Sequence, residues 1–188
     1  LENEKRRSDV RLLLMGAVLN NNASGQDGDP METALFNMAR EAGLIPEQVR
    51  LQSPRKGEIP FDSRRKLMTT VNEIEGHDIV FVKGAVDVLL KKCTRLANPA
   101  AGQGTGLAGQ RPGESGRGTE AVIPCRTLSS SDRQRILDQN SRWSARGLRV
   151  LAFACRPLNE AGKENGNSGY AEAKAGNSRE QSSCQAGW

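Results

Sequence analysis

The large aliphatic residues of this chain are concentrated in residues 8–97 and 119–158, and this distribution limits which parts of the chain can form a folded core. Residues 159–188 contain no Val, Ile, Leu, Met or Phe, and residues 98–118 contain seven glycines with Leu107 as their single large aliphatic residue. Segments this polar cannot bury enough apolar surface to offset the entropy lost on folding. We therefore expect one domain over residues 8–158, with a Gly-rich insertion at about 98–118 and a polar, disordered tail at 159–188.

The apolar spacing in the first part of the chain is helical. Apolar residues recur on one face from about Ser8 to Leu19, which predicts a helix. A second helix starts at Asp29, which suits the N-cap, and Glu32 falls at the third helical position of a capping box. Gly43 is expected to end this helix.

After a short turn or helix at 46–49 the spacing becomes that of strands, at Arg50–Phe61, Leu67–Ile74 and Asp78–Val82. The short turn between the last two predicts an antiparallel hairpin. A helix follows from Val86, a capping box at Ser131 opens another, and Leu148–Cys155 reads as a final strand. These patterns predict an α+β fold, a mainly antiparallel twisted sheet flanked by helices.

The bulk composition restricts the function classes. The formal charge is +5, but the basic residues are scattered among acidic ones and no aromatic stripe accompanies them, which favours a solvated surface over a nucleic-acid site. The four cysteines form no Cys-x-x-Cys pair and His77 is the single histidine, so no zinc site of the usual spacing exists. No apolar run reaches the length of about 20 residues that spans a bilayer, and no signal peptide opens the chain, so we expect a soluble polypeptide.

Two segments carry candidate chemistry. In residues 58–69, Phe61 and Lys66 lie beside a predicted strand. In residues 80–85, Lys83 follows a predicted buried strand. A flat ring suits a base and a lysine suits a phosphate, so the pair indicates a nucleotide site that lacks a glycine-rich phosphate loop. Structural alternatives stay open: Phe61 could be core, Lys66 part of a surface charge run, and Lys83 an ordinary solvated lysine. Glu32 fits a helix cap as well as a ligand.

Four motifs resemble those of cation-pumping P-type ATPases, and they occur in that family's order. They are Gly28-Asp29-Pro30-Met31-Glu32-Thr33-Ala34-Leu35, Ile59–Thr69, Phe81-Val82-Lys83-Gly84-Ala85-Val86-Asp87, and Arg146–Ala154. The chain thus resembles the nucleotide-binding (N) domain of a type II, calcium-transporting-like pump. Met31, Ser63, Val86 and Asp87 depart from the family's usual residues.

The resemblance implies ATP as the ligand, with Mg²⁺ in the full pump, and it implies a role for each matching residue. Phe61 would stack on adenine, Glu32 would face the adenine amino group, and Lys66 and Met68 would line the base pocket. Lys83 and Gly84 would form the pocket floor. Arg149 would meet the phosphates, with Leu151 packed under the nucleotide on the same strand face.

The motifs for phosphorylation and hinge movement are absent from the sequence, as is any nucleophile beside a positioned base. The resemblance therefore implies a cytoplasmic domain of a membrane pump that binds ATP without hydrolysing it. It would present the γ-phosphate to an aspartate on a separate phosphorylation domain, with that domain and the actuator domain as partners. The alternatives are a basic nucleic-acid-binding protein and an interaction domain that binds no nucleotide.

Overall fold

The computed structural model describes residues 2–24, 28–97 and 125–158, with side chains from residue 10 onwards. The insertion predicted at 98–118 and the tail predicted at 159–188 lie outside these residues. The described elements are α1 (Glu2–Leu19), α2 (Pro30–Glu41), α3 (Pro46–Gln52), β1 (Arg55–Asp62), β2 (Leu67–Ile74), β3 (His77–Gly84), α4 (Val86–Lys92), β4 (Arg95–Ala97), β5 (Cys125–Thr127), α5 (Ser130–Ala145) and β6 (Ala152–Pro157).

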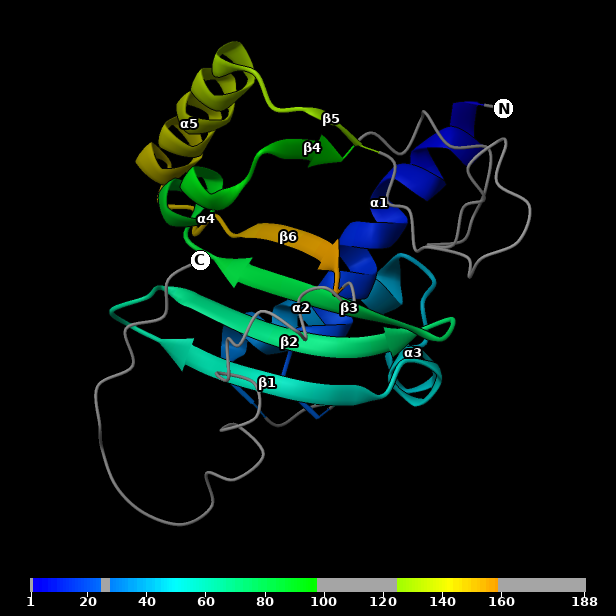
Figure 1. Ribbon diagram of the computed structural model, residues 1–188. Helices are drawn as coiled ribbons and strands as arrows, with labels where there is room; N and C mark the ends of the chain where they lie inside the picture. The colour runs from blue at the N-terminus through cyan, green and yellow to red at the C-terminus, as the bar shows by residue number, and fades with distance from the viewer. Residues whose placement is uncertain (1, 25–27, 98–124, 159–188) are drawn as a thin grey trace, which may run out of the picture.

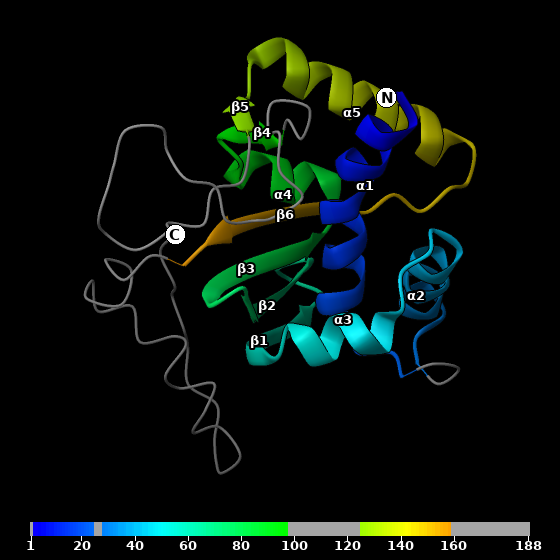
Figure 2. The ribbon, with the colours of Figure 1, turned by 90° about the vertical axis from the view of Figure 1, so that its right-hand side faces the viewer.

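A four-stranded sheet forms the centre of the fold. Its order is β1-β2-β3-β6 and every neighbouring pair is antiparallel, while β4 and β5 form a separate two-stranded sheet. Helices α1, α2 and α3 lie on one side of the large sheet (Figure 1), and α1 stands directly against it in the turned view (Figure 2). This arrangement confirms the predicted α+β class.

The core lies between α1 and the sheet. Leu19, Ile74, Ile79 and Phe81 form one buried cluster, and a second joins α1 to α2. A Cβ added to Gly16 would lie 3.3 Å from the Phe153 ring and 3.4 Å from the Phe81 ring, so a glycine here lets the helix approach closely.

Helix ends and turns follow the local signals. The N–H groups of Gly43 and Leu44 donate to the carbonyls of Arg40 and Ala39, the hydrogen-bond pattern of a Schellman cap, and Gly43 has a φ of 88°. The β2–β3 turn is tighter than expected. His77 already pairs with Ile74, and the two residues between them, Glu75 and Gly76, both have positive φ as a type I′ turn requires.

Several predicted boundaries are wrong. Helix α1 starts at Glu2 and not near Ser8, β3 runs on to Gly84 and not only to Val82, and β6 ends at Pro157 and not at Cys155. The strand expected from Arg50 starts at Arg55 because residues 50–52 complete α3. Helix α5 starts two residues early, because the capping box forms between Ser129 and Asp132. The strand expected from Leu148 starts at Ala152. The Leu148 N–H donates to the Trp143 carbonyl at 3.1 Å, so Leu148 belongs to the cap of α5.

Candidate functional site

Most of the predicted site residues converge on one end of the large sheet, which we call the pocket end after the nucleotide pocket that the sequence predicts. A continuous row of register partners marks it: Asp62 pairs with Leu67, Leu67 with Gly84, and Gly84 with Ala152. It is the left end of the sheet in Figure 1. Six of the predicted residues lie in this row or directly beside one of its members in sequence: Phe61, Lys66, Met68, Lys83, Gly84 and Leu151.

Glu32 joins this group through a buried ion pair. Its Oε1 lies 2.6 Å from the Nζ of Lys83, and the side chains of Lys83 and Glu32 are 4% and 14% exposed. The other oxygen, Oε2, accepts the N–H of Asn22 at 3.1 Å. The capping box expected at Asp29 is therefore not made. Instead, Asp29 Oδ1 accepts the Met31 N–H at 2.9 Å. The charge of Lys83 is thus neutralised inside the domain.

Met68 lies beside Lys83, and Gly84 follows Lys83 at the end of β3. Met68 is 2% exposed and directly opposite Lys83 in the sheet, so the two side chains share a face. A Cβ on Gly84 would lie 2.1 Å from the Lys66 carbonyl oxygen, closer than any side chain can come. That oxygen accepts the Ala85 N–H at 3.2 Å, so the β1–β2 loop rests on the end of β3.

The β1–β2 loop presents its lysine from an uncommon backbone conformation. Lys66 has a φ of 56°, in the left-handed region, and its N–H donates to the Asp62 carbonyl at 2.6 Å. Asp62 Oδ1 accepts the N–H groups of Arg65 and Arg64 at 2.7 and 2.9 Å. These two hydrogen bonds lower the pKa of Asp62, and the one from Arg65 has the larger effect. Phe61 precedes this loop and is 54% exposed, so it is available to a ligand and is not core.

Arg149 and Leu151 lie before β6, in the segment that leads from α5. Leu151 is half-buried, and Arg149 is exposed with no hydrogen bond or ion pair to any described residue. The expectation that the two share a strand face is wrong, because residues 148–151 are not in the strand. Arg149 is thus close to the pocket end in sequence, but no described contact joins it to the other site residues.

Sequence reasoning missed the asparagines that follow α1. Asn20 is fully buried, and its Nδ2 donates to the carbonyls of Met68 (3.1 Å) and Phe81 (2.9 Å). Asn21 Nδ2 donates to the Glu32 carbonyl at 2.8 Å. The sequence signal for them is the run Asn20-Asn21-Asn22 directly after an apolar helical face, a pattern that is equally typical of a plain loop.

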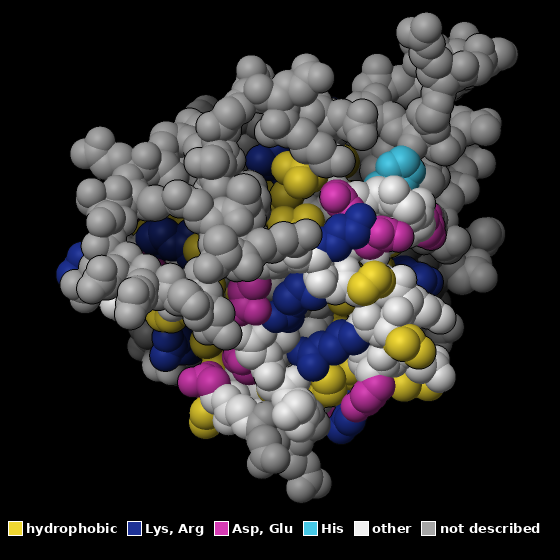
Figure 3. Space-filling view, turned by 60° about the horizontal axis from the view of Figure 1, so that its bottom comes forward, with side chains coloured by type: hydrophobic (Ala, Val, Ile, Leu, Met, Phe, Trp, Pro, Cys, Tyr) yellow, Lys and Arg dark blue, Asp and Glu magenta, His cyan; other side chains and the backbone are white. Residues whose placement is uncertain are grey.

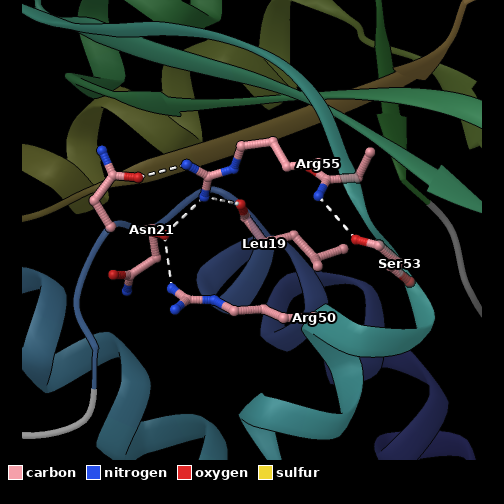
Figure 4. A pocket seen from close by; sticks show the side chains of 7 residues that line it. Leu19, Asn21, Arg50, Ser53 and Arg55 are labelled. Carbon is pink, nitrogen blue, oxygen red and sulfur yellow. Dashed lines mark hydrogen bonds between the residues drawn. The ribbon is translucent and has the colours of Figure 1, made fainter.

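The opposite end of the sheet, which we call the cavity end, contains a cavity of about 220 Å³ beside the Arg55–Asn72 pair. Figure 4 shows Arg50 and Arg55 pointing toward Asn21 and the end of α1. Arg50 donates to the carbonyls of Val18, Asn21 and Ala23, and Arg55 to those of Leu19 and Asn21, at 2.7–3.2 Å. Guanidinium groups suit a helix C-terminus because its last carbonyls lack partners. Burial lowers the pKa of Arg50, and the nearby positive charge of Arg55 lowers it further.

Basic and acidic side chains lie interspersed on the face that Figure 3 brings forward. Among the described residues, no helix combines the length and apolar character needed to cross a bilayer.

Comparison of the sequence with known proteins identifies the protein family. The sequence model of the P-type ATPase cytoplasmic domain N matches residues 8–109. The chain is 33% identical over 159 residues to calcium-transporting ATPase 1 of Lactococcus lactis, covering 82% of this chain and 16% of that relative. It is 32% identical over 166 residues to calcium-transporting ATPase 1 of Bacillus cereus, covering 86% of this chain and 16% of that relative. A probable cation-transporting ATPase F of Mycobacterium tuberculosis is 31% identical over 147 residues, covering 74% of this chain and 14% of the relative.

The antiparallel sheet with its flanking helices thus has the architecture of a cytoplasmic pump domain. The chain belongs to the P-type ATPase family, in which it corresponds to cytoplasmic domain N of a type II pump. The predicted resemblance and the predicted cytoplasmic placement are confirmed. The chain spans only 16% of the length of the first two relatives, so it represents one part of such a pump.

Proposed function

We propose that the chain binds ATP at the pocket end of the sheet. The observation that supports this most directly is the convergence of six motif residues on the row Asp62–Leu67–Gly84–Ala152, in a chain of this family. Phe61 stacks on adenine, and an aromatic face contributes roughly 1–3 kcal/mol per base. Met68 and Gly84 form the wall beside it.

Glu32 and Lys83 act on the base side of this site. Lys83 is buried and already paired, so reaching a phosphate would leave the Glu32 carboxylate without its counter-charge. A carboxylate has about four lone-pair sites, so Glu32 can accept an adenine amino group while keeping Lys83 and the Asn22 N–H. The exposed side chain of Arg149 meets the phosphates, and Lys66, exposed beside Leu67, lines the base pocket with Met68.

In the full pump this domain delivers the nucleotide. It holds ATP and, by closing on a separate phosphorylation domain, presents the γ-phosphate to an aspartate of that domain. The phosphorylation domain and the actuator domain are its partners in the pump. Mg²⁺ neutralises phosphate charge in such transfers. No three acidic, His or Cys side chains among the described residues are grouped to hold a metal ion, so we assign Mg²⁺ to the nucleotide and the partner domain. The transported species is a cation, and the isolated chain binds ATP without hydrolysing it.

Titration of the 188-residue chain with ATP, followed by calorimetry and by amide NMR shifts, tests this proposal. We expect shifts at Phe61, Lys66 and Arg149. Phe61→Ala should weaken binding by about 1–3 kcal/mol without lowering the melting temperature, because the ring is 54% exposed. Leu51→Ala is the matched control, since Leu51 is 83% exposed and lies in α3.

Two results would contradict the proposal. One is a wild-type chain in which millimolar ATP shifts no residue of the pocket end. The other is equal loss of affinity in Phe61→Ala and Leu51→Ala. Binding of oligonucleotides with steep salt dependence and without ATP binding would favour the nucleic-acid alternative instead.

A further inference from the structure

Asn22 lies between three charged side chains, two from β1 and one from α2. Its Nδ2 donates to Glu58 Oε1 at 2.8 Å, and its Oδ1 accepts from Arg55 Nη1 at 2.5 Å. Its main-chain N–H donates to Glu32 Oε2 at 3.1 Å. Because a carboxylate only accepts and a guanidinium only donates, this orientation of the amide is the one that satisfies both partners.

The contacts of Asn22 connect β1 to the carboxylate of Glu32 on α2. Arg55 and Glu58 both lie on β1, the strand that carries Phe61, and they form an ion pair at 2.7 Å. Glu32 lies on α2 and holds Lys83 of β3. Asn22 therefore links the strand of the stacking ring to the carboxylate, although it touches neither the ring nor the site where a base would lie.

We propose that Asn22 is a positioning residue. It fixes the Glu32 carboxylate relative to β1 and thereby makes the site select bases that carry an exocyclic amino group. The proposal rests on the ATP site proposed above. Adenine offers that amino group, whereas hypoxanthine has a carbonyl oxygen at the same place, which a carboxylate cannot bind. A fixed Glu32 carboxylate therefore gives a preference for ATP over inosine triphosphate, and displacement of the carboxylate reduces this preference.

The variant that tests this is Asn22→Asp. It keeps the shape of the side chain and the contact with Arg55, but it turns a donor into a carboxylate oxygen that repels Glu58. We expect ATP affinity to fall about tenfold, as loss of one charge-assisted hydrogen bond would give, with inosine triphosphate affinity unchanged. Asn37→Asp, on the exposed face of α2, is the control for the added charge. In a Glu32→Gln background, Asn22→Asp should have no further effect on the preference.

A second measurement needs no nucleotide. The amide hydrogen of residue 22 donates to Glu32, so in the wild type its exchange with solvent should be slow. It should become about tenfold faster in Asn22→Asp and in Glu32→Gln, and stay unchanged in Asn37→Asp.

The outcomes are separable. Equal weakening of ATP and inosine triphosphate in Asn22→Asp would overturn the proposal, since a residue that only supports the fold acts on both. Unchanged exchange at residue 22 would overturn it as well. A wild-type chain that binds neither nucleotide would contradict the ATP site, and the exchange rates would still decide whether Asn22 positions Glu32.

Discussion

The pocket end and the cavity end of the sheet use the same kind of side chain in opposite ways. At the cavity end, Arg50 and Arg55 together donate to four main-chain carbonyls, those of Val18, Leu19, Asn21 and Ala23. At the pocket end the side chain of Lys66 is exposed, and so is that of Arg149, which is close to this end in sequence. Neither side chain has a hydrogen bond or ion pair to a described residue. Basic residues therefore stabilise one end and remain available to a ligand at the other. Counting charges could not separate the two uses.

The largest effect is expected from breaking the buried ion pair between Glu32 and Lys83 at the pocket end. Glu32→Gln leaves the ammonium of Lys83 buried without a counter-charge, so the free energy of unfolding should fall by about 3–5 kcal/mol. Urea unfolding measures it, with Glu41→Gln on the exposed end of α2 as control. The double variant Glu32→Gln/Lys83→Met should recover part of the loss. A drop no larger than that of the control would mean that the pair is not buried as described.

Replacing one arginine at each end by methionine should separate stability from binding. Arg50→Met removes three hydrogen bonds and the contact of the guanidinium with the Phe36 ring at 4.7 Å, so it should cost about 2–3 kcal/mol of stability. Arg149→Met should leave stability unchanged and weaken ATP binding. Thermal unfolding and calorimetry give both quantities. The reverse pattern would show that the two ends have been assigned the wrong way round.

Two glycines give a smaller and purely steric comparison. Gly84→Ala places a methyl group 2.1 Å from the Lys66 carbonyl, a main-chain atom that cannot rotate away, and should cost about 1–3 kcal/mol. At Gly57 in β1 the nearest atom is 3.9 Å away, so Gly57→Ala should be neutral. Equal melting temperatures for the two variants would contradict the close approach of β3 to the loop.

The backbone at Lys66 predicts a modest gain. Its φ of 56° is costly for a side chain and free for glycine, so Lys66→Gly should raise stability by at most about 1 kcal/mol. The same change should weaken ATP binding, because it removes a side chain that lines the base pocket. A gain in stability with unchanged ATP affinity would mean that Lys66 has no part in the site.

The smallest effect is expected from Asp62. Its pKa is lowered by the N–H groups of Arg65 and Arg64, so its contribution to stability is complete above the ordinary aspartate pKa of about 3.9 and is lost as the pH falls through the lower folded value. Carboxyl NMR shifts should report that titration below about pH 4. Asp62→Asn should abolish this step in acid unfolding, and a midpoint at the ordinary value would contradict the two hydrogen bonds.

The sequence predicted most of the elements because the signals that define them are local. Gly43 and Gly147 end helices with positive φ, and the residues at 75–76 form the expected hairpin turn. The errors at Leu148 and Glu32 share one cause, since each residue fits a local pattern but a different interaction takes its polar group. Leu148 has the spacing of a strand, but the cap of α5 takes its N–H. Glu32 has the spacing of a helix cap, but a lysine 51 residues away takes its carboxylate.

What the sequence determined by itself is the family, the class of fold and the motif residues, because motifs and periodicity are properties of neighbouring residues. The tertiary structure decided how those residues are used. Only strand register places Phe61, Lys66 and Lys83 at one end of the sheet, and only packing makes Lys83 a buried partner of Glu32 while Lys66 stays exposed. The role of Asn22 is likewise a product of the fold, since its three partners come from β1 and α2. Burial and pairing depend on residues distant in the chain, and a linear pattern does not contain them.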